Sequence, residues 1–501
     1  MRILLATFGW ENLGVAYLAS LARKMGHSVD LLFDPGLFED HLAISSPKMR
    51  KLFDPWPEME KKLLSTKPDI IGVNIFSSGY NWARKLTDNI RRIYPDIKII
   101  AGGPHATVTP KTVLEKDGEF DGVMVGESEI AWQQLLERYS DGDDKLPDDI
   151  KGLWVRKNGA IIENGWGKLE TDLDSLPFPA KDLFAPYFPI KHTYNIIATR
   201  GCPYSCSFCQ NSAFKKQYGK DWSGLRARSP ENLIDELKQA KSLYGIRFVH
   251  FIDDCFTTDK HWLAEFLPRY KKEVGLPFSC INHPATIDEE RSILLKDSGC
   301  HSVVIGVQSW DAQTRKGLYG RGESNEQIRN ALKIASSKGL RVIVNHINNH
   351  PGETLDDLET AASEYANHKL MRIATFHLTY FPGTDLTEHA LNSGWINPER
   401  LDLLNEGRVD DYHDGGSQKD PHHTKLVQGF ELLVHMYPLM PKSIKKILAN
   451  KTGITALAHA PRSFKQIADL LTTFIYNDQE PLIYMRYYLH HLKRALGRKF
   501  P

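Results

Sequence analysis

The sequence predicts an α/β protein with three parts: a doubly wound, Rossmann-like domain, a partial (β/α)6 TIM-like barrel, and a small helical C-terminal domain. Short β-rich runs alternate with amphipathic stretches up to about residue 145, and the alternation resumes with a different rhythm from about residue 193. After about residue 400 the strand pattern fades. Alternating strands and helices are typical of parallel sheets covered by helices on both faces, which predicts the α/β class.

Five β-rich runs and the helical patterns between them define the first domain, residues 1–145. The predicted strands are residues 2–7, 29–33, 70–76, 97–101 and 122–125. The helical patterns include residues 13–25, 58–65 and 80–94. This order predicts a parallel, doubly wound sheet.

Residues 146–190 are predicted to form a linker that packs against another part of the protein. Pro, Gly and Asp are frequent there, and two short strands are expected at residues 152–155 and 160–163, around a turn at Lys157, Asn158 and Gly159. Four prolines are interleaved with aromatic residues between residues 176 and 189.

Residues 191–400 show six strand patterns with a helical pattern in every gap. The predicted strands are residues 195–199, 248–252, 278–282, 302–308, 341–345 and 372–380, and the helices are residues 232–244, 260–274, 288–297, 325–338 and 354–368. Six β/α units are fewer than the eight of a closed barrel, so a lateral opening is expected.

Residues 401–501 are predicted to form the helical domain, with helices at residues 425–437 and 481–498. The region also contains a polar run at residues 410–423 and a basic end at residues 493–499. The acidic residues and histidines of the polar run lack metal-ligand spacing. This region either closes over the substrate or packs on the barrel. We expect its helices to pack on the barrel and the polar run to be solvated.

The composition fits a globular protein of two or three domains, because 501 residues exceed what one core usually supports. The chain has 63 Lys and Arg residues against 62 Asp and Glu residues, so it lacks the basic excess of a nucleic-acid-binding protein. Six cysteines, three of them within eight positions, favour a metal or redox site in a reducing compartment. No nucleic-acid partner is expected.

The hydrophobic segments predict neither a signal peptide nor a transmembrane span. The apolar run at the N-terminus breaks at Gly9 without a cleavage site, and the runs at residues 70–76 and 302–307 are far shorter than the ~20 residues that cross a bilayer. A cytoplasmic location is expected.

Three cysteines, Cys202, Cys206 and Cys209, directly follow the first strand of the predicted barrel. Three thiolates can hold three irons of a 4Fe-4S cube and leave the fourth iron open to a small molecule. A zinc site needs a fourth Cys or His nearby, and none follows closely after Cys209. The spacing therefore favours a cluster with one open iron.

This C-x3-C-x2-C spacing, with the aromatic Phe208 before the last cysteine, resembles the signature of the radical S-adenosylmethionine (SAM) superfamily. The resemblance implies that the open iron chelates the amino and carboxylate groups of SAM. It also implies that one electron, from an external donor such as flavodoxin or ferredoxin, cleaves SAM to a 5'-deoxyadenosyl radical.

Further strand ends resemble the elements with which this superfamily binds SAM. The resemblance assigns Asp253 and Asp254 to the methionine amino group, Gln308 and Ser309 to the ribose and carboxylate, and Arg321 to the carboxylate or ribose. Gln308 stands where a glutamate is common, which leaves its contacts open.

Three other features can be read either as site residues or as ordinary structure. Residues 350–354 and 380–384 match superfamily elements that follow the fifth and sixth strands, yet Pro-Gly pairs are also common in turns. Cys255 lies at a strand mouth, where it either contacts substrate or is a small buried residue.

Small residues follow three successive strands of the first domain. They are Ser77 and Ser78, then Gly102, Gly103 and His105, and then Gly126 and Glu127. Ligands of open α/β sheets lie at the carboxyl ends of the strands, and small residues allow a close approach. These ends suit a bulky, nucleotide-like group.

Such a domain before a radical SAM barrel, with Gly-Gly-Pro-His and Val-Gly-Glu at its strand ends, resembles the cobalamin-binding radical SAM subfamily over about the first 400 residues. The sequence has no Asp-x-His-x-x-Gly run, so the resemblance implies cobalamin without a histidine ligand from that motif, and His105 as a lining residue. The glycines are also compatible with a domain retained only for packing. A methylthiotransferase would need a second set of cysteines, and residues 1–201 contain none.

The resemblance implies an enzyme that methylates an unactivated carbon, or phosphorus, of a small-molecule biosynthetic intermediate through a 5'-deoxyadenosyl radical and methylcobalamin. A non-methylating radical reaction, such as cyclisation, ring contraction or oxidation, would use the same cofactors. A non-catalytic cobalamin or iron-sulfur sensor is the alternative from a different class.

Overall fold

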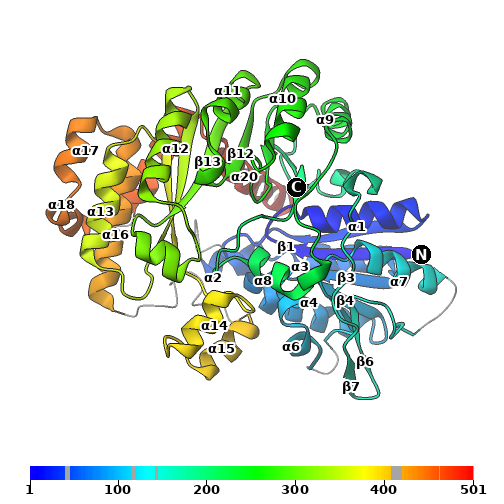
Figure 1. Ribbon diagram of the computed structural model, residues 1–501. Helices are drawn as coiled ribbons and strands as arrows, with labels where there is room; N and C mark the ends of the chain where they lie inside the picture. The colour runs from blue at the N-terminus through cyan, green and yellow to red at the C-terminus, as the bar shows by residue number, and fades with distance from the viewer. Residues whose placement is uncertain (40–45, 116–118, 141–144, 408–419, 462, 500–501) are drawn as a thin grey trace.

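The computed structural model describes residues 1–501 except 40–45, 116–118, 141–144, 408–419, 462, 500 and 501 (Figure 1). The predicted polar run at residues 410–423 therefore lies outside the described residues apart from 420–423. Figure 1 shows the N-terminal domain beside the barrel, with the C-terminal helices along the far side of the barrel and behind it.

The first sheet has seven strands in the order β2-β1-β3-β4-β5-β6-β7. Five are parallel: β1 Arg2–Phe8, β2 Ser28–Asp34, β3 Ile70–Asn74, β4 Lys98–Gly102 and β5 Gly122–Met124. The antiparallel hairpin β6 Leu153–Lys157 and β7 Ala160–Ile162 completes the sheet. This hairpin comes from the segment predicted as a linker, so the division at residue 145 stays a prediction.

Helices cover both faces of this sheet, as the doubly wound class requires. They are α1 Leu13–Lys24, α2 Pro47–Leu52, α3 Trp56–Thr66, α4 Tyr80–Ile93, α5 Pro104–Val108, α6 Pro110–Glu115 and α7 Glu129–Ser140. Successive residues of β1 point to opposite faces: Ile3 and Leu5 enter one core cluster, and Leu4 and Ala6 enter another.

The second sheet has six parallel strands in the order β15-β14-β13-β12-β11-β8, which confirms the partial barrel. They are β8 Tyr194–Ile196, β11 Val249–Phe251, β12 Phe278–Asn282, β13 Cys300–Gln308, β14 Arg341–Asn348 and β15 Arg372–His377. The outer helices are α9 Pro230–Tyr244, α10 Lys260–Glu273, α11 Glu289–Asp297, α12 Asn325–Ser337 and α13 Leu355–Ala366.

Smaller elements complete the barrel region. Strands β9 Thr199–Arg200 and β10 Arg226–Ala227 form an antiparallel pair. The additional helices are α8 Gln210–Tyr218, α14 Asp385–Asn392 and α15 Pro398–Asn405, and Thr314–Leu318 forms a single π turn. Short 3-10 turns lie at Ser77–Gly79, Leu173–Ser175, Lys181–Leu183, Gly219–Asp221, Pro284–Thr286 and Tyr437–Leu439.

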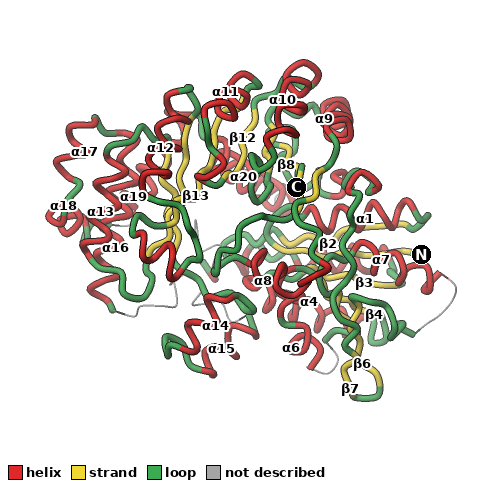
Figure 2. The backbone as a smooth tube through the Cα atoms, viewed as in Figure 1, coloured by secondary structure: helices red, strands yellow, loops and turns green. Residues whose placement is uncertain are grey.

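The C-terminal region is helical, as predicted: α16 Pro421–Met436, α17 Lys442–Leu448, α18 Lys451–Leu457, α19 Ser463–Tyr476 and α20 Gln479–Lys499 (Figure 2). Phe430 of α16 packs on His346 of β14, and the Tyr487 hydroxyl of α20 donates to the carbonyl of Gly9, 2.6 Å away. In the part of the chain that the structure describes, no helix is both long and apolar enough to cross a membrane.

Candidate active site

The cysteine loop follows β9 and is fixed by backbone hydrogen bonds to two segments that come much later in the chain. The amide of Ser207 donates to the carbonyl of Tyr319 at 3.1 Å, and the amide of Leu386 donates to the carbonyl of Ser207 at 2.9 Å. Gly320 has a φ of +64°, and a Cβ there would lie 3.1 Å from the carbonyl oxygen of Ser205. The loop and residue 320 pack so closely that only glycine fits without strain.

The three thiols of the loop are half-buried and free of disulfides. Burial raises the pKa of Cys202 to about 12 and the pKa of Cys209 to about 11, and it also raises the pKa of Cys206. A metal binds thiolates, so cluster loading displaces three protons here. The donor set and its placement at the mouth of the barrel fit an iron-sulfur cluster.

Within the described residues, no group of three or more His, Cys, Asp or Glu side chains has the arrangement of a single-ion metal site. The thiolates of a cubane cluster each bind a different iron, so they need not converge on one point.

Arg321 is buried and lies against the cysteine loop. Its Nε donates to Glu323 Oε1 at 2.6 Å, its Nη2 donates to the carbonyl of Gly306 at 2.7 Å, and its Nη1 lies 3.8 Å from the Sγ of Cys206. The guanidinium is therefore held beside a predicted cluster ligand by a buried carboxylate.

His283 and Tyr204 extend this arrangement on the other side of Glu323. The two rings stack with centroids 3.7 Å apart, and His283 Nε2 lies 3.6 Å from Glu323 Oε2. Burial, together with the nearby charge of Arg321, lowers the pKa of His283 to about 3, so its ring is neutral. Since Nδ1 accepts from the amide of Ala285, the proton lies on Nε2, facing Glu323.

The sequence pattern singles out Arg321 but not Glu323, His283 or Tyr204. His283 directly follows β12, and a polar residue at a strand end was the one signal available in the sequence.

The two adjacent acidic residues of the predicted SAM site have different surroundings. Asp253 is fully buried and accepts hydrogen bonds from the amide of Ala198 at 3.1 Å and the hydroxyl of Thr199 at 2.7 Å. Asp254 is exposed, is hydrogen-bonded to Asn211, and its charge contributes to the raised pKa of Cys209. Asp254 therefore faces the cysteine loop, whereas Asp253 fixes the backbone that leads into it.

Gln308 ends β13 in a left-handed conformation, with a φ of +65°, after a break in the pairing with β14. A non-glycine residue in this region is strained, and such strain is concentrated at functional sites. Ser309 is buried and accepts from the amide of Asp311 at 3.1 Å. Phe208 packs edge-to-face on Tyr319, with centroids 5.3 Å apart.

The remaining candidate residues of the barrel have structural partners. Cys255 is buried, with its Sγ 3.6 Å from the hydroxyl of Thr286. In residues 350–354, Glu353 accepts from the amide of Asn349 at 2.8 Å and lies 3.0 Å from His423 Nε2 of α16. Thr384, in residues 380–384, caps α14 by accepting from the amide of Thr387.

The sheet topology places the crevice of the N-terminal domain between β1 and β3, because the strand order reverses there. The crevice is therefore bordered by Phe8 and Gly9 on one side and by Phe76 and Ser78 on the other, and both Phe76 and Ser78 are exposed. The sequence pattern identifies the ends of β3, β4 and β5 as candidate binding positions but misses the end of β1. The small residue at that end, Gly9, is equally typical of the place where an apolar run simply stops.

His105 is buried, and both of its ring nitrogens are hydrogen-bonded. Nδ1 lies 3.0 Å from the Ser77 hydroxyl, and Nε2 lies 3.0 Å from the carbonyl of Asn405, at the end of α15. Burial lowers the pKa of His105 to about 4. The carbonyl can only accept, so Nε2 carries the proton and Nδ1 accepts from Ser77, which leaves neither nitrogen available as a ligand.

The ends of β4 and β5 differ in accessibility. Gly102 is partly exposed, with only the side chain of Met124 close to its Cβ position, and Gly103 packs against Asn74. Gly126 is covered by Tyr218 of α8, and Glu127 pairs with Arg226 and, at 3.3 Å, with Arg200. Glu127 thus joins the N-terminal domain to the strand that leads into the cysteine loop.

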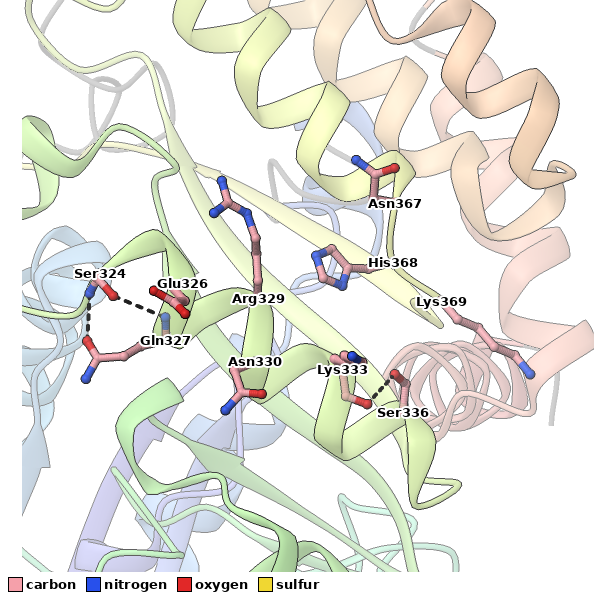
Figure 3. Close-up of a pocket in the computed structure, with 10 residues that line it drawn as sticks. All are labelled: Ser324, Glu326, Gln327, Arg329, Asn330, Lys333, Ser336, Asn367, His368 and Lys369. Carbon is pink, nitrogen blue, oxygen red and sulfur yellow. Dashed lines mark hydrogen bonds between the residues drawn. The ribbon is translucent and has the colours of Figure 1, made fainter.

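A groove of about 720 Å³ lies on the outer helical layer of the barrel (Figure 3). Polar side chains of α12, such as Arg329 and Asn330, line it with His368 from the segment after α13. None of the predicted site residues lines this groove.

Comparison with known proteins finds matches to both α/β domains. A family model described as the radical SAM superfamily matches residues 196–364, and a model described as a B12 binding domain matches residues 1–136. An uncharacterized methyltransferase of Pyrococcus horikoshii is 30% identical over 384 residues, which cover 76% of this chain and 78% of the relative.

Two further relatives carry names of defined reactions. Cytidylyl-2-hydroxyethylphosphonate methyltransferase of Streptomyces wedmorensis is 25% identical over 77% of this chain and 79% of its own length. Anaerobic magnesium-protoporphyrin IX monomethyl ester cyclase of Rubrivivax gelatinosus is 23% identical over 70% of this chain and 61% of its own length.

Among solved structures, the cobalamin-dependent SAM radical enzyme OxsB, with aqua-cobalamin and SAM bound, superposes with a TM-score of 0.65 at 14% identity. The match covers all of this chain and 81% of that one. At this identity the likeness concerns the fold, and it includes the order of the two α/β domains. Together, the two family models, the relative from Pyrococcus horikoshii and the shared fold show that the chain belongs to the cobalamin-binding radical SAM enzymes.

Proposed function

We propose that this enzyme methylates an unactivated carbon, or phosphorus, of a small-molecule biosynthetic intermediate. The observation that carries the proposal is the position of the cysteine loop. It lies at the carboxyl ends of the barrel strands and is joined to the N-terminal domain through the ion pairs of Glu127 with Arg200 and Arg226. Two relatives named as methyltransferases cover about three quarters of the chain and support the same reaction class.

The residues of this chain fall into three groups in the proposal. Cys202, Cys206 and Cys209 hold a 4Fe-4S cluster, Asp254 and Gln308 bind SAM beside it, and the carboxyl ends of β1, β3 and β4 receive cobalamin. When bound, these groups supply an electron for the cleavage of SAM and a methyl group for the substrate.

The protein itself positions the reactants and excludes water. Arg321 is held between Glu323 and Cys206, so its positive charge lies beside one cluster ligand and offsets negative charge that gathers there. Asp253 holds the backbone of Ala198 and Thr199, which fixes the start of the loop.

A second candidate is a non-methylating radical reaction with the same cofactors, which the relative named as a cyclase favours. The two reactions differ in their products. Methylation adds one CH2 to the substrate and consumes a second SAM, which leaves as S-adenosylhomocysteine, whereas cyclisation or oxidation removes hydrogen without any gain of carbon.

The experiment uses the anaerobically reconstituted protein with cobalamin, a reductant and SAM labelled in its methyl group. We expect 5'-deoxyadenosine and S-adenosylhomocysteine to form, and label to enter a small molecule of a cell extract. The Cys209→Ala variant should form no 5'-deoxyadenosine, and Cys300→Ala, which changes a buried cysteine outside the loop, serves as the control. A fully loaded protein that leaves SAM intact contradicts the proposal, and 5'-deoxyadenosine without methyl transfer favours the second candidate.

A further inference from the structure

Helix α19, Ser463–Tyr476, has its apolar residues on the outside. Six large apolar side chains, each between 45% and 65% exposed, lie on the surface of this one helix: Phe464, Ile467, Leu470, Leu471, Phe474 and Ile475. We call this set the α19 face. Helices on a protein surface normally turn such a stripe toward the core.

The side of α19 that contacts the protein is small and polar instead. Ala468, Thr472 and Thr473 are buried, the Asp469 carboxylate lies 2.5 Å from His435 Nδ1, and Lys465 lies 3.3 Å from Glu431. These contacts with α16 fix the orientation of the helix, so the α19 face cannot turn inward without breaking them. A contiguous exposed apolar surface of this kind marks an interaction site.

The charge of the surrounding segment indicates what covers the α19 face. Residues 440–499 contain eleven of the chain's 63 Lys and Arg residues but only three of its 62 Asp and Glu residues. All three acidic residues have basic partners: Asp469 with His435, and Asp478 and Glu480 with Arg372. Three of the basic residues are also paired with carboxylates outside the segment, Lys451 with Asp356, Lys465 with Glu431 and Arg494 with Glu58. The remaining basic residues leave the segment with a net positive charge.

Exposed basic residues remain available on two other helices of the C-terminal region. Lys442 and Lys446 of α17 and Lys493 of α20 are exposed, and the structure's described residues include no carboxylate within ion-pair distance of any of them. On α17 the lysines alternate with Ile444 and Ile447, which are also exposed. Apolar and basic side chains thus occur together on α17, and on α20 Lys493 lies between the exposed Leu489 and Leu496.

We propose that the α19 face docks the enzyme onto an anionic lipid surface. An apolar helix face that enters the boundary between headgroups and acyl chains, together with basic residues that attract anionic headgroups, is the pattern of proteins that lie on a membrane without crossing it. A symmetric contact between two copies of the chain would bring two strongly basic segments together, and the repulsion disfavours it.

The test measures flotation of the full-length, cluster-loaded protein with vesicles of phosphatidylcholine, with and without phosphatidylglycerol. We expect binding to the anionic vesicles, little binding to the neutral ones, and loss of binding as the salt concentration rises. The triple variant Ile467→Ser/Leu471→Ser/Phe474→Ser should bind the anionic vesicles at least about tenfold more weakly than the wild type, because three apolar side chains no longer enter the lipid.

Leu243→Ser, which changes a 63% exposed leucine on α9, is the matched control and should bind like the wild type. Lys442→Gln/Lys446→Gln leaves the apolar face intact and should weaken binding to anionic vesicles only.

Light scattering tests the competing occupant. A protein that fails to bind anionic vesicles overturns the proposal, and so does a triple variant that binds like the wild type. A dimer that the triple variant converts to a monomer also overturns it, because a second copy would then cover the α19 face.

Discussion

At the residue scale, a buried chain of polar contacts holds Arg321 beside the cysteine loop. Glu323 Oε1 accepts a hydrogen bond from the Nε of Arg321 at 2.6 Å, and both side chains are almost completely buried. A buried arginine without its carboxylate partner keeps its desolvation cost without the compensating attraction.

We therefore expect Glu323→Gln to lower the free energy of unfolding by about 3 kcal/mol, because it leaves the Arg321 charge buried and unpaired. Chemical denaturation under anaerobic conditions measures the change. Glu326→Gln is the matched control, since Glu326 lies exposed three residues further along. Equal stability of Glu323→Gln and the wild type would show that Arg321 does not depend on this carboxylate.

The pKa of Asp253 gives a second prediction. Burial raises this pKa from its ordinary value of 3.8 to about 6, so the folded state holds the proton more tightly than the unfolded chain. The stability that this proton provides is fully present below pH 3.8 and is lost as the pH rises through 6.

Asp253→Asn cannot ionise and so avoids this loss. We expect the stability of the variant relative to the wild type to increase by about 2–3 kcal/mol between pH 4 and pH 7. Unfolding curves measured for both proteins across that range provide the comparison. A constant difference between the two proteins would mean that the Asp253 pKa is not raised.

At the element scale, the cysteine loop depends on the turn that follows the π turn Thr314–Leu318. Gly320 has a φ of +64° and lies against the backbone of the loop, whereas a Cβ at Gly317, within the π turn, would meet no atom within 4 Å. The two glycines are three residues apart, but only position 320 requires a residue without a side chain.

Gly320→Ala should therefore strain the turn by about 1–3 kcal/mol and lower the iron and sulfide content per chain after reconstitution. Gly317→Ala should reconstitute like the wild type, because its methyl group enters open space and its backbone is not left-handed. If both variants load the cluster equally well, the contact between residue 320 and the loop does not control loading.

At the scale of the whole molecule, one continuous core joins the three parts of the chain. The same cluster of buried side chains includes Leu5 of the first sheet, Val249 of the barrel, Phe430 of α16 and Tyr487 of α20. Helix α20 thereby links the end of the chain to the carboxyl ends of β1 and β2, next to the predicted cobalamin crevice.

Tyr487→Ala should lower the free energy of unfolding by about 3–5 kcal/mol, because it removes a buried ring that stacks on Phe188 and a hydroxyl that donates to Gly9. Leu489→Ala, at an exposed position two residues later, should change it by less than about 0.5 kcal/mol. Denaturation followed by both circular dichroism and tryptophan fluorescence measures the two values. Transitions that do not coincide would show that the domains unfold independently.

The sequence by itself determined the fold class, the spacing of the three cysteines and the family. Strand periodicity and thiol spacing are local properties of the sequence, so they can be recognised before the fold is known. It also indicated Arg321, since a short motif surrounds that residue. The division at residue 145 and the roles of all the predicted site residues, those of the three cysteines and Arg321 included, stay predictions.

Only the tertiary structure separated Asp253 from Asp254, brought Glu323 and His283 to Arg321, and placed the end of β1 beside β3. Adjacent acids look alike in a sequence until burial distinguishes them. Contacts between strand ends depend on the strand order, which periodicity does not record. The exposure of the apolar residues of α19 could not be predicted either, because their spacing fits any amphipathic helix. Only the packing of α19 against α16 decides which side of the helix meets the solvent.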